Sequence, residues 1–162
     1  MRWRIAIIAA VVLLDQLTKL YIQTNFSPFD TVPVIPGVFN IVHAENPGAA
    51  FSMLADAPLA VRRAVLVVLS GAVMAIIGFL LFRRQPTSAK ETIITPIGLS
   101  LVLGGALGNF WDRIVVGTVT DFLQVFIGSY EYPSFNVADS AIFCGAVLLI
   151  ADLWRNRNAT TS

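Results

Sequence analysis

The stretch FNVADSAIFCGAVLLIADLW, residues Phe135 to Trp154, decides the fold. The part after Asp139 is almost wholly apolar, and its length suits a helix that crosses the roughly 30 Å hydrocarbon core of a bilayer. If Asn136 is the N-cap, Asp139 stands at position N3 of that helix, where free backbone N–H groups and the helix dipole favour a carboxylate. The stretch therefore predicts a membrane-spanning helix whose acid either only stabilises the helix start or has a functional role.

The composition of the whole chain also indicates a membrane protein. Of the 162 residues, 56% are hydrophobic and 13% are charged, and the mean hydropathy is +0.75. Soluble domains carry about 25% charged residues, so we interpret this chain as an integral membrane protein. A formal net charge of +1 gives no broad field for nucleic-acid binding. The single cysteine, Cys144, excludes an intrachain disulfide, and the single histidine, His43, excludes a His-based metal cluster, so we expect no metal and no cofactor.

Four apolar runs are long enough to span the membrane as helices. They cover approximately residues 3–22, 64–82, 93–111 and 138–154. The connection over residues 23–63 is rich in β-branched and aromatic residues separated by Pro and Gly, which is typical of short strands and turns. The connection over residues 112–137 is expected to be an outward loop. The predicted fold class is an all-α bundle of four transmembrane helices with a small extracytoplasmic β-containing region, in one domain of residues 1–162.

The positions of Lys and Arg predict the orientation, because cytoplasmic loops carry an excess of these residues. One side of the membrane collects Arg2, Arg4, Arg83, Arg84, Lys90, Arg155 and Arg157. The other side has Arg62, Arg63 and Arg113, with Lys19 at the end of its helix. We therefore expect both termini in the cytoplasm and both longer connections on the outer side.

Asp15 and Lys19 are charged residues within the first span. At a rise of 1.5 Å per residue, Asp15 lies roughly 16 Å beyond Arg4, past the bilayer midpoint toward the outside. Lys19 follows one turn later on the same face, so the two could form an ion pair that reduces the cost of burying both charges. A direct role near a substrate, or a supporting role beneath an active site, is the alternative, because charges inside spans are often functional.

The sequence GGALGNFWDR, residues 104–113, closes the third span. Its small residues would let another helix, or a bound chain, approach the backbone closely. Asn109 and Asp112 share one helix face, and Arg113 follows. A helix-packing face that ends in an Asp/Arg surface pair would also account for this segment.

Asp121 and Asp139 indicate a functional site more strongly together than either does alone. Separate parts of the chain place both acids at the same membrane boundary. Two neighbouring carboxylates do not both ionise readily, so one can hold a proton while the other stays charged. Such a pair supplies a general base for a water molecule and a general acid for a carbonyl oxygen or a leaving amine. Closeness of Asp121 and Asp139 is a hypothesis at this point.

These blocks together resemble a known family. The sequence is similar to bacterial lipoprotein signal peptidase, signal peptidase II, in DQLTK (15–19), ENPGAAF (45–51), GGALGNFWDR (104–113), VTDF (119–122) and FNVAD (135–139). The blocks occur in the family's order over most of the chain. Each block alone would be a weak signal, whereas five in order are specific.

The resemblance implies an aspartic endopeptidase of the bacterial inner membrane, with its active site near the outer face. Its substrate would be a diacylglyceryl-modified prolipoprotein, cut just before the modified cysteine, and the enzyme would act in the lipid bilayer as a monomer. The catalytic pair of the family falls on Asp121 and Asp139. Positions associated with substrate binding or with support of the pair fall on Asp15, Lys19, Asn46, Gly105, Asn109, Arg113 and Asn136.

Three other classes of protein remain as alternatives. A proton-coupled transporter could use Asp15, Lys19 and Asp139 as a relay, although Asp152 is the only acid at the inner ends of the spans. A serine/lysine signal peptidase could use Lys19, but Ser70 and Ser100 belong to other spans. A scaffold without enzymatic activity is the third alternative. Dependence of cleavage on the lipid group of a precursor would separate the signal peptidase II reading from all three.

Overall fold

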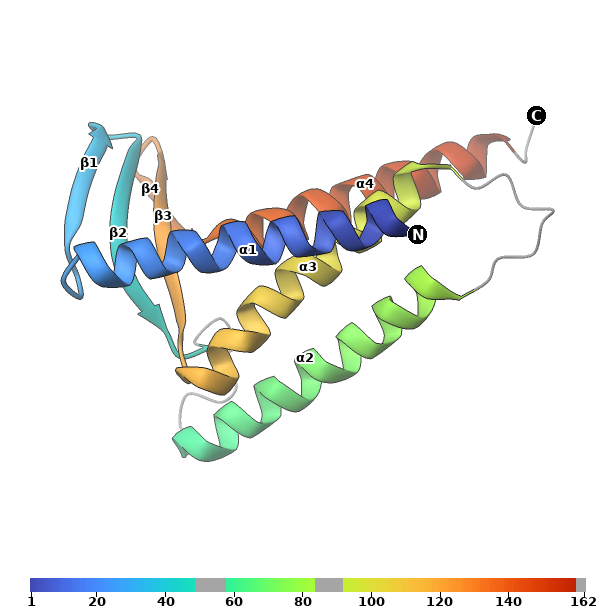
Figure 1. Ribbon diagram of the computed structural model, residues 1–162. Coiled ribbons are helices and arrows are strands. Elements are labelled where there is room, and N and C mark those ends of the chain that lie inside the picture. The colour runs from blue at the N-terminus through green and yellow to red at the C-terminus, as the bar shows by residue number, and fades with distance from the viewer. Residues whose placement is uncertain (49–57, 84–91, 160–162) are drawn as a thin grey trace.

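A computed structural model of the chain describes residues 1–48, 58–83 and 92–159 (Figure 1). In chain order the elements are α1 (Arg2–Asn25), β1 (Thr31–Ile35), β2 (Phe39–Asn46), α2 (Leu59–Phe82), α3 (Ile94–Val115), β3 (Val119–Ile127), β4 (Tyr130–Phe135) and α4 (Val137–Ala159). Arg84 and Lys90, which entered the predicted orientation, lie outside the described residues, as do residues 49–51 of the ENPGAAF block.

The four predicted spans are confirmed as helices long and apolar enough to cross a membrane. The helices are longer than the apolar runs from which they were predicted. Helix α1 continues past Ile22 to Asn25, α2 begins at Leu59 and α3 continues past Trp111 to Val115. Hydropathy detects only the apolar part of a helix, whereas backbone hydrogen bonding continues into the polar interfacial region at its ends.

Helix α3 lies at the centre of the bundle and packs against α4, α1 and α2 (Figure 1). Its glycines allow this packing. A methyl group on Gly105 would overlap the carbonyl oxygen of Ala138 on α4, and one on Gly108 would overlap the carboxylate of Asp15 on α1. The small side chains in residues 104–108 therefore allow α1 and α4 to approach α3 closely.

One antiparallel sheet, in the order β1-β2-β3-β4, stands at one end of the bundle (Figure 1). Strands β1 and β2 confirm the strands expected in the first connection. The expectation of a loop over residues 112–137 is wrong, because this segment completes α3 and then forms β3 and β4. Strand β3 pairs with β2, with Asp121 opposite Ala44, and a two-residue turn, Gly128-Ser129, joins it to β4.

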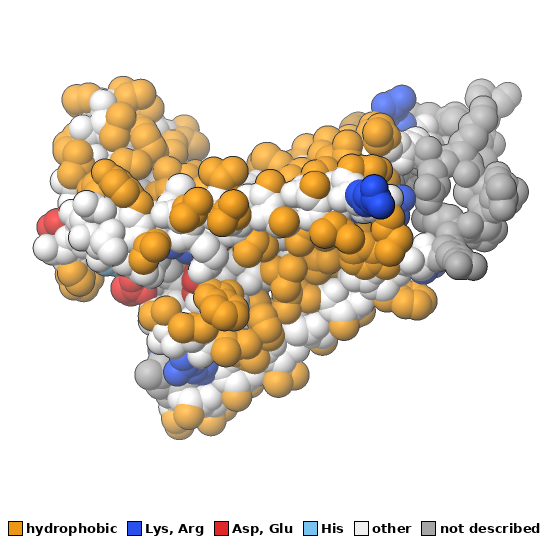
Figure 2. All heavy atoms as spheres, viewed as in Figure 1, with side chains coloured by type: hydrophobic (Ala, Val, Ile, Leu, Met, Phe, Trp, Pro, Cys, Tyr) orange, Lys and Arg blue, Asp and Glu red, His pale blue; other side chains and the backbone are white. Residues whose placement is uncertain are grey.

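The outer surface of the bundle is apolar (Figure 2). Large side chains on different helices point outward, among them Leu13 at 60% exposed, Val68 at 71% and Leu153 at 71%. Helices that are hydrophobic on their outer faces are typical of membrane spans, where lipid rather than water covers those faces. Both termini lie at the end of the bundle away from the sheet (Figure 1).

Candidate active site

Asp121 lies on β3, where the sheet meets the helix bundle, and is only 3% exposed. Its two carboxylate oxygens accept hydrogen bonds from two different amides. Asn136 Nδ2 donates to Oδ1 at 2.8 Å, and Asn46 Nδ2 donates to Oδ2 at 2.9 Å. Asn46 is itself fixed at the end of β2, because its Oδ1 accepts the backbone N–H of Gly48 at 2.9 Å.

Asp139 lies in the first turn of α4 and forms a reciprocal cap with Asn136. The Asp139 N–H donates to Asn136 Oδ1 at 2.9 Å, and the Asn136 N–H donates to Asp139 Oδ2 at 3.3 Å. The helix-start role expected for Asp139 is therefore present. It does not exclude a chemical role, because Oδ1 of the same carboxylate faces α3 and accepts from Asn109 Nδ2 at 2.7 Å.

Asn136 bridges the two acids and is fully buried. The backbone N–H of Asp139 can only donate, so the side-chain atom of Asn136 that meets it must be the oxygen. The amide nitrogen of Asn136 then points to Asp121. The Asn136 side chain thus bonds to the Asp121 carboxylate and to the backbone of Asp139, while the Asn136 backbone N–H bonds to the Asp139 carboxylate. The structure brings together the two residues that the sequence left apart.

The electrostatics of Asp121 reflect its burial. Loss of contact with water raises the pKa of Asp121 to about 6, and the negative charge of Asp139 acts in the same direction. The hydrogen bonds from Asn46 and Asn136 act in the opposite direction and only partly compensate. Asp121 therefore holds a proton in mildly acidic solution, where an ordinary aspartate would be ionised.

Lys19 sits behind the two acids as a buried cation. The predicted pair with Asp15 is confirmed at 2.8 Å, and Lys19 Nζ also donates to Asp112 Oδ2 at 2.6 Å and to Asn109 Oδ1 at 2.9 Å. Asp15 reaches across to α4, where its Oδ1 accepts the backbone N–H of Ala138 at 2.9 Å. These contacts tie α1 to the helix start that carries Asp139.

The suggested Asp112/Arg113 surface pair is wrong. Asp112 is 5% exposed and pairs with Lys19 of α1 rather than with its neighbour Arg113. Sequence reasoning did not assign Asp112 or Gln16, whose Nε2 donates to Asp112 Oδ1 at 2.9 Å. The shared helix face of Asn109 and Asp112 was the one signal available, since both side chains meet Lys19.

Arg113 is half-buried in the last turn of α3, within electrostatic reach of Asp121 and Asp139. Its Nη1 donates to Asn109 O at 3.4 Å, and its Nε has no hydrogen-bond partner among the described residues. The guanidinium is therefore available to a ligand. Gly105, in contrast, packs against the backbone of Ala138, so it supports the start of α4 and does not face the acids directly.

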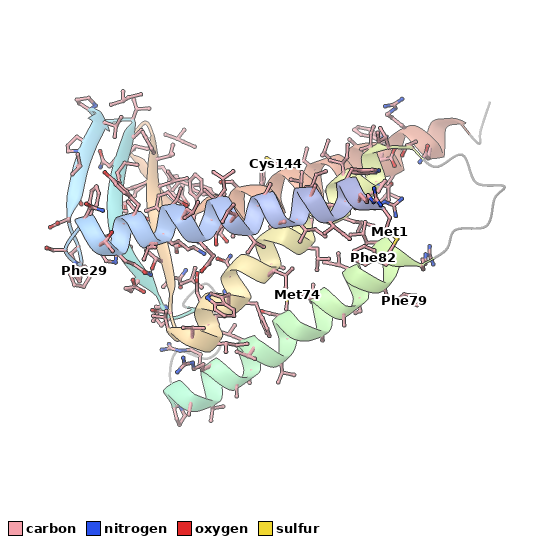
Figure 3. The ribbon with its side chains drawn as sticks, viewed as in Figure 1. Met1, Phe29, Met74, Phe79, Phe82 and Cys144 are labelled. Atoms are coloured by element: carbon pink, nitrogen blue, oxygen red, sulfur yellow. The ribbon has the colours of Figure 1, made fainter. Side chains whose placement is uncertain are left out.

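An apolar cavity of about 500 Å³ reaches Asp139 from the side of α4 and the sheet. Its lining consists of Val125, Tyr132, Phe135, Asp139, Ser140, Phe143 and Cys144. Phe143 is 68% exposed on the outer surface of α4, and Cys144 beside it is also exposed, partway along the helix (Figure 3). The cavity therefore connects the apolar surface of the bundle with one of the two acids.

The site has the groups for acid–base hydrolysis. Within residues 1–48, 58–83 and 92–159, no group of three His, Cys, Asp or Glu side chains is placed to hold a metal ion. Lys19 has all three of its N–H groups engaged, so it is not available as the base of a serine/lysine pair. The site also contains two carboxylates, the buried Asp121, which holds a proton up to about pH 6, and the partly exposed Asp139.

Four helices long enough to span a membrane, with two aspartates linked through Asn136 where the bundle meets the sheet, are the features expected of a membrane aspartic peptidase. The family model described as Signal peptidase (SPase) II matches residues 7–155. The chain belongs to the signal peptidase II family.

Curated relatives agree with this assignment. A lipoprotein signal peptidase of Solibacter usitatus is 46% identical over 156 residues, which cover 96% of this chain and 93% of the relative. One of Syntrophus aciditrophicus is 43% identical and covers 88% of this chain and 86% of its own length. The fold is similar to a bacterial membrane enzyme solved by the in meso method at 2.3 Å resolution, with a TM-score of 0.83, 30% identity and coverage of 97% of this chain and 90% of that one.

Proposed function

We propose that this chain removes the signal peptide from prolipoproteins by hydrolysing the peptide bond before the diacylglyceryl-modified cysteine, with Asp121 and Asp139 as the catalytic pair. The observation that carries the assignment of residues is the Asn136 bridge. Its amide donates to Asp121 at 2.8 Å and its oxygen accepts from the N–H of Asp139 at 2.9 Å, so the two carboxylates are held in one site.

The two carboxylates take different roles in the proposed reaction. Asp121, with its pKa raised to about 6, is the acid that protonates the scissile carbonyl oxygen or the leaving amine. Asp139, whose oxygens accept N–H bonds from Asn109 and Asn136, is the base that removes a proton from the attacking water. The negative charge that develops on the carbonyl oxygen would be met by a donor such as Arg113, and one such donor stabilises the transition state by roughly 3 kcal/mol.

The proposed substrate enters from the bilayer. The cavity beside Asp139 has an apolar lining and opens at Phe143 and Cys144 on the outer surface of α4. A diacylglyceryl group and an apolar signal helix both reside in lipid, so they can reach this opening without crossing water. Asn46, Asn109 and Arg113 are the polar groups proposed to meet the substrate backbone or to hold the acids in place.

The proposed orientation places the sheet and both acids on the outer side of the cytoplasmic membrane and both termini in the cytoplasm. The end of the bundle that carries the termini has Arg2, Arg4, Arg83 and Arg155, in agreement with the excess of basic residues on cytoplasmic sides. All groups of the site come from one chain, so we propose that a single domain acts as a monomer.

The test is cleavage of one precursor in two forms, with and without its diacylglyceryl group, by the purified protein in lipid bicelles. Cleavage only of the lipidated form is the expected result, since the lipid would bring the scissile bond to the depth of the acids. Equal cleavage of both forms would contradict the proposed substrate. A control with Asp139→Asn shows whether the observed cleavage belongs to this site.

A further inference from the structure

Asp112 and Gln16 lie beneath the candidate active site and touch neither Asp121 nor Asp139. Asp112 Oδ2 accepts from Lys19 Nζ at 2.6 Å, and its Oδ1 accepts from Gln16 Nε2 at 2.9 Å. The same Gln16 nitrogen lies 3.2 Å from Asp15 Oδ2, the other carboxylate bound to Lys19. Asp112 and Asp15 therefore hold the Lys19 ammonium between them, with Gln16 connecting the two carboxylates.

Neutralisation of Lys19 does not by itself require Asp112. Lys19 carries one positive charge, and Asp15 alone would balance it. A second buried carboxylate leaves the three groups with an excess negative charge, and burying such a charge is costly unless it has a compensating purpose. If Asp112 served stability alone, its removal would lower the free energy of unfolding, because Lys19 and Gln16 would each lose a buried partner, but the folded protein would keep its kcat.

The geometry of the Lys19 ammonium indicates that Asp112 fixes the direction of the Lys19 N–H bonds. An ammonium group has three N–H bonds in fixed tetrahedral directions. Asp15 and Asp112 take two of them, which aims the third at Asn109 Oδ1, 2.9 Å away. With the oxygen of Asn109 fixed on Lys19, its nitrogen must point to Asp139 Oδ1, where it donates at 2.7 Å.

A rotated Asn109 amide would change the site. Exchange of its oxygen and nitrogen would place an NH₂ group against the Lys19 ammonium and an oxygen against the Asp139 carboxylate, so both contacts would become repulsive. The second hydrogen bond to Asn109 Oδ1, from Asn136 Nδ2, is longer at 3.3 Å. Lys19 is therefore the stronger constraint on the orientation of the amide that meets Asp139.

We propose that Asp112 is a positioning residue of this peptidase, which holds Lys19 so that Asn109 keeps its N–H on Asp139. The inference rests on the proposed function, because it assigns Asp112 to the reaction of Asp121 and Asp139. Small displacements of a catalytic group cost up to about 10²-fold in rate. We expect Asp112→Ala to lower kcat about 30-fold with little change in KM, and the isosteric Asp112→Asn, which keeps an acceptor oxygen for Lys19, to lower it less.

A double-mutant cycle with Asn109→Ala tests the proposal, measured with enzyme in excess over a lipidated precursor. Once the Asn109 amide is gone, Asp112 has nothing to orient, so Asp112→Ala should cost less than about 3-fold in that background. Losses that multiply, about 30-fold in both backgrounds, would overturn the proposal. Glu131→Gln, an exposed acid on β4 paired with Gln124, is the control and should not change kcat.

Thermal unfolding of the same variants in detergent separates positioning from stability. Asp112→Ala is expected to lower the Tm, because Lys19 and Gln16 each lose a hydrogen-bond partner, but kcat should stay about 30-fold low at temperatures well below that Tm. Recovery of full kcat at temperatures where thermal unfolding shows Asp112→Ala to be fully folded would overturn the proposal, and this criterion applies even if Asn109→Ala is too slow for the cycle. Failure of the unaltered protein to cleave the lipidated precursor would instead count against the proposed function, which is a different result from an additive cycle.

Discussion

At the scale of the residue, the pKa of Asp121 sets the expected pH range of activity. Burial raises this pKa to about 6, so the group is protonated below pH 6 and loses its proton above it. Because Asp121 is proposed to act as the acid, kcat/KM should fall about tenfold for each pH unit above pH 6. A pH–rate profile on one lipidated precursor measures this, and a rise in activity from pH 6 to pH 8 would contradict the assigned role.

Replacement of either acid tests the catalytic pair. Asp121→Asn and Asp139→Asn keep the shape of the side chain but remove the group that takes up or gives up a proton. Each should reduce cleavage by about 10²- to 10⁴-fold. Thermal unfolding should show that both variants remain folded, because the amide can retain hydrogen bonds to its neighbours. Full activity in either folded variant would exclude that residue from the chemistry.

Single residues also show where sequence reasoning reaches its limit. The contacts of Asp15 with Lys19 and of Asn136 with Asp139 are local, so spacing along one helix was enough to predict them. Asp112 was missed because its partners, Lys19 and Gln16, belong to another helix. Only the packing of α1 on α3 brings these groups together.

At the scale of the element, the contact between α3 and α4 depends on Gly105. A side chain there would overlap the backbone of Ala138 and push away the helix start that carries Asp139. We expect Gly105→Val to cost at least about 1–3 kcal/mol of stability through overpacking and to reduce activity as well. Thermal unfolding in detergent and a cleavage assay measure the two effects.

Gly78→Ala on α2 is the matched control for this prediction. A methyl group at Gly78 would meet nothing within 4 Å, so the variant should be as stable and active as the unaltered protein. Comparable losses in both variants would show that the effect comes from glycine replacement in general and not from the contact between α3 and α4.

Strands β3 and β4 were not predicted from the sequence. Gln124, Gly128 and Pro133 interrupt the apolar pattern over residues 119–135, which favoured a loop. The segment forms strands because β2, far away in the sequence, pairs with one edge of β3, and β4 pairs with the other edge across the Gly128-Ser129 turn. Such long-range pairing overrides local preference, and the four helices, whose signal is local, were predicted correctly.

At the scale of the whole molecule, the sheet and the termini lie at opposite ends of the bundle. We expect a cysteine at Phe29, which is 90% exposed between α1 and β1, to react with a membrane-impermeant maleimide in intact cells (Figure 3). A cysteine at Arg2 should react only after the membrane is opened. Both changes are made with Cys144→Ala to remove the native thiol, and labelling of Arg2→Cys in intact cells would contradict the proposed orientation.

The two acids lie on β3 and α4 and accept hydrogen bonds from Asn46 of β2, Asn109 of α3 and Asn136, and Asp15 of α1 binds the backbone next to Asp139. If the two acids are the catalytic pair, as proposed, a newly made chain cannot cleave substrate until β3 and α4, among the last elements to be made, have packed against the rest. Under that proposal, a partly assembled chain would not digest neighbouring membrane proteins.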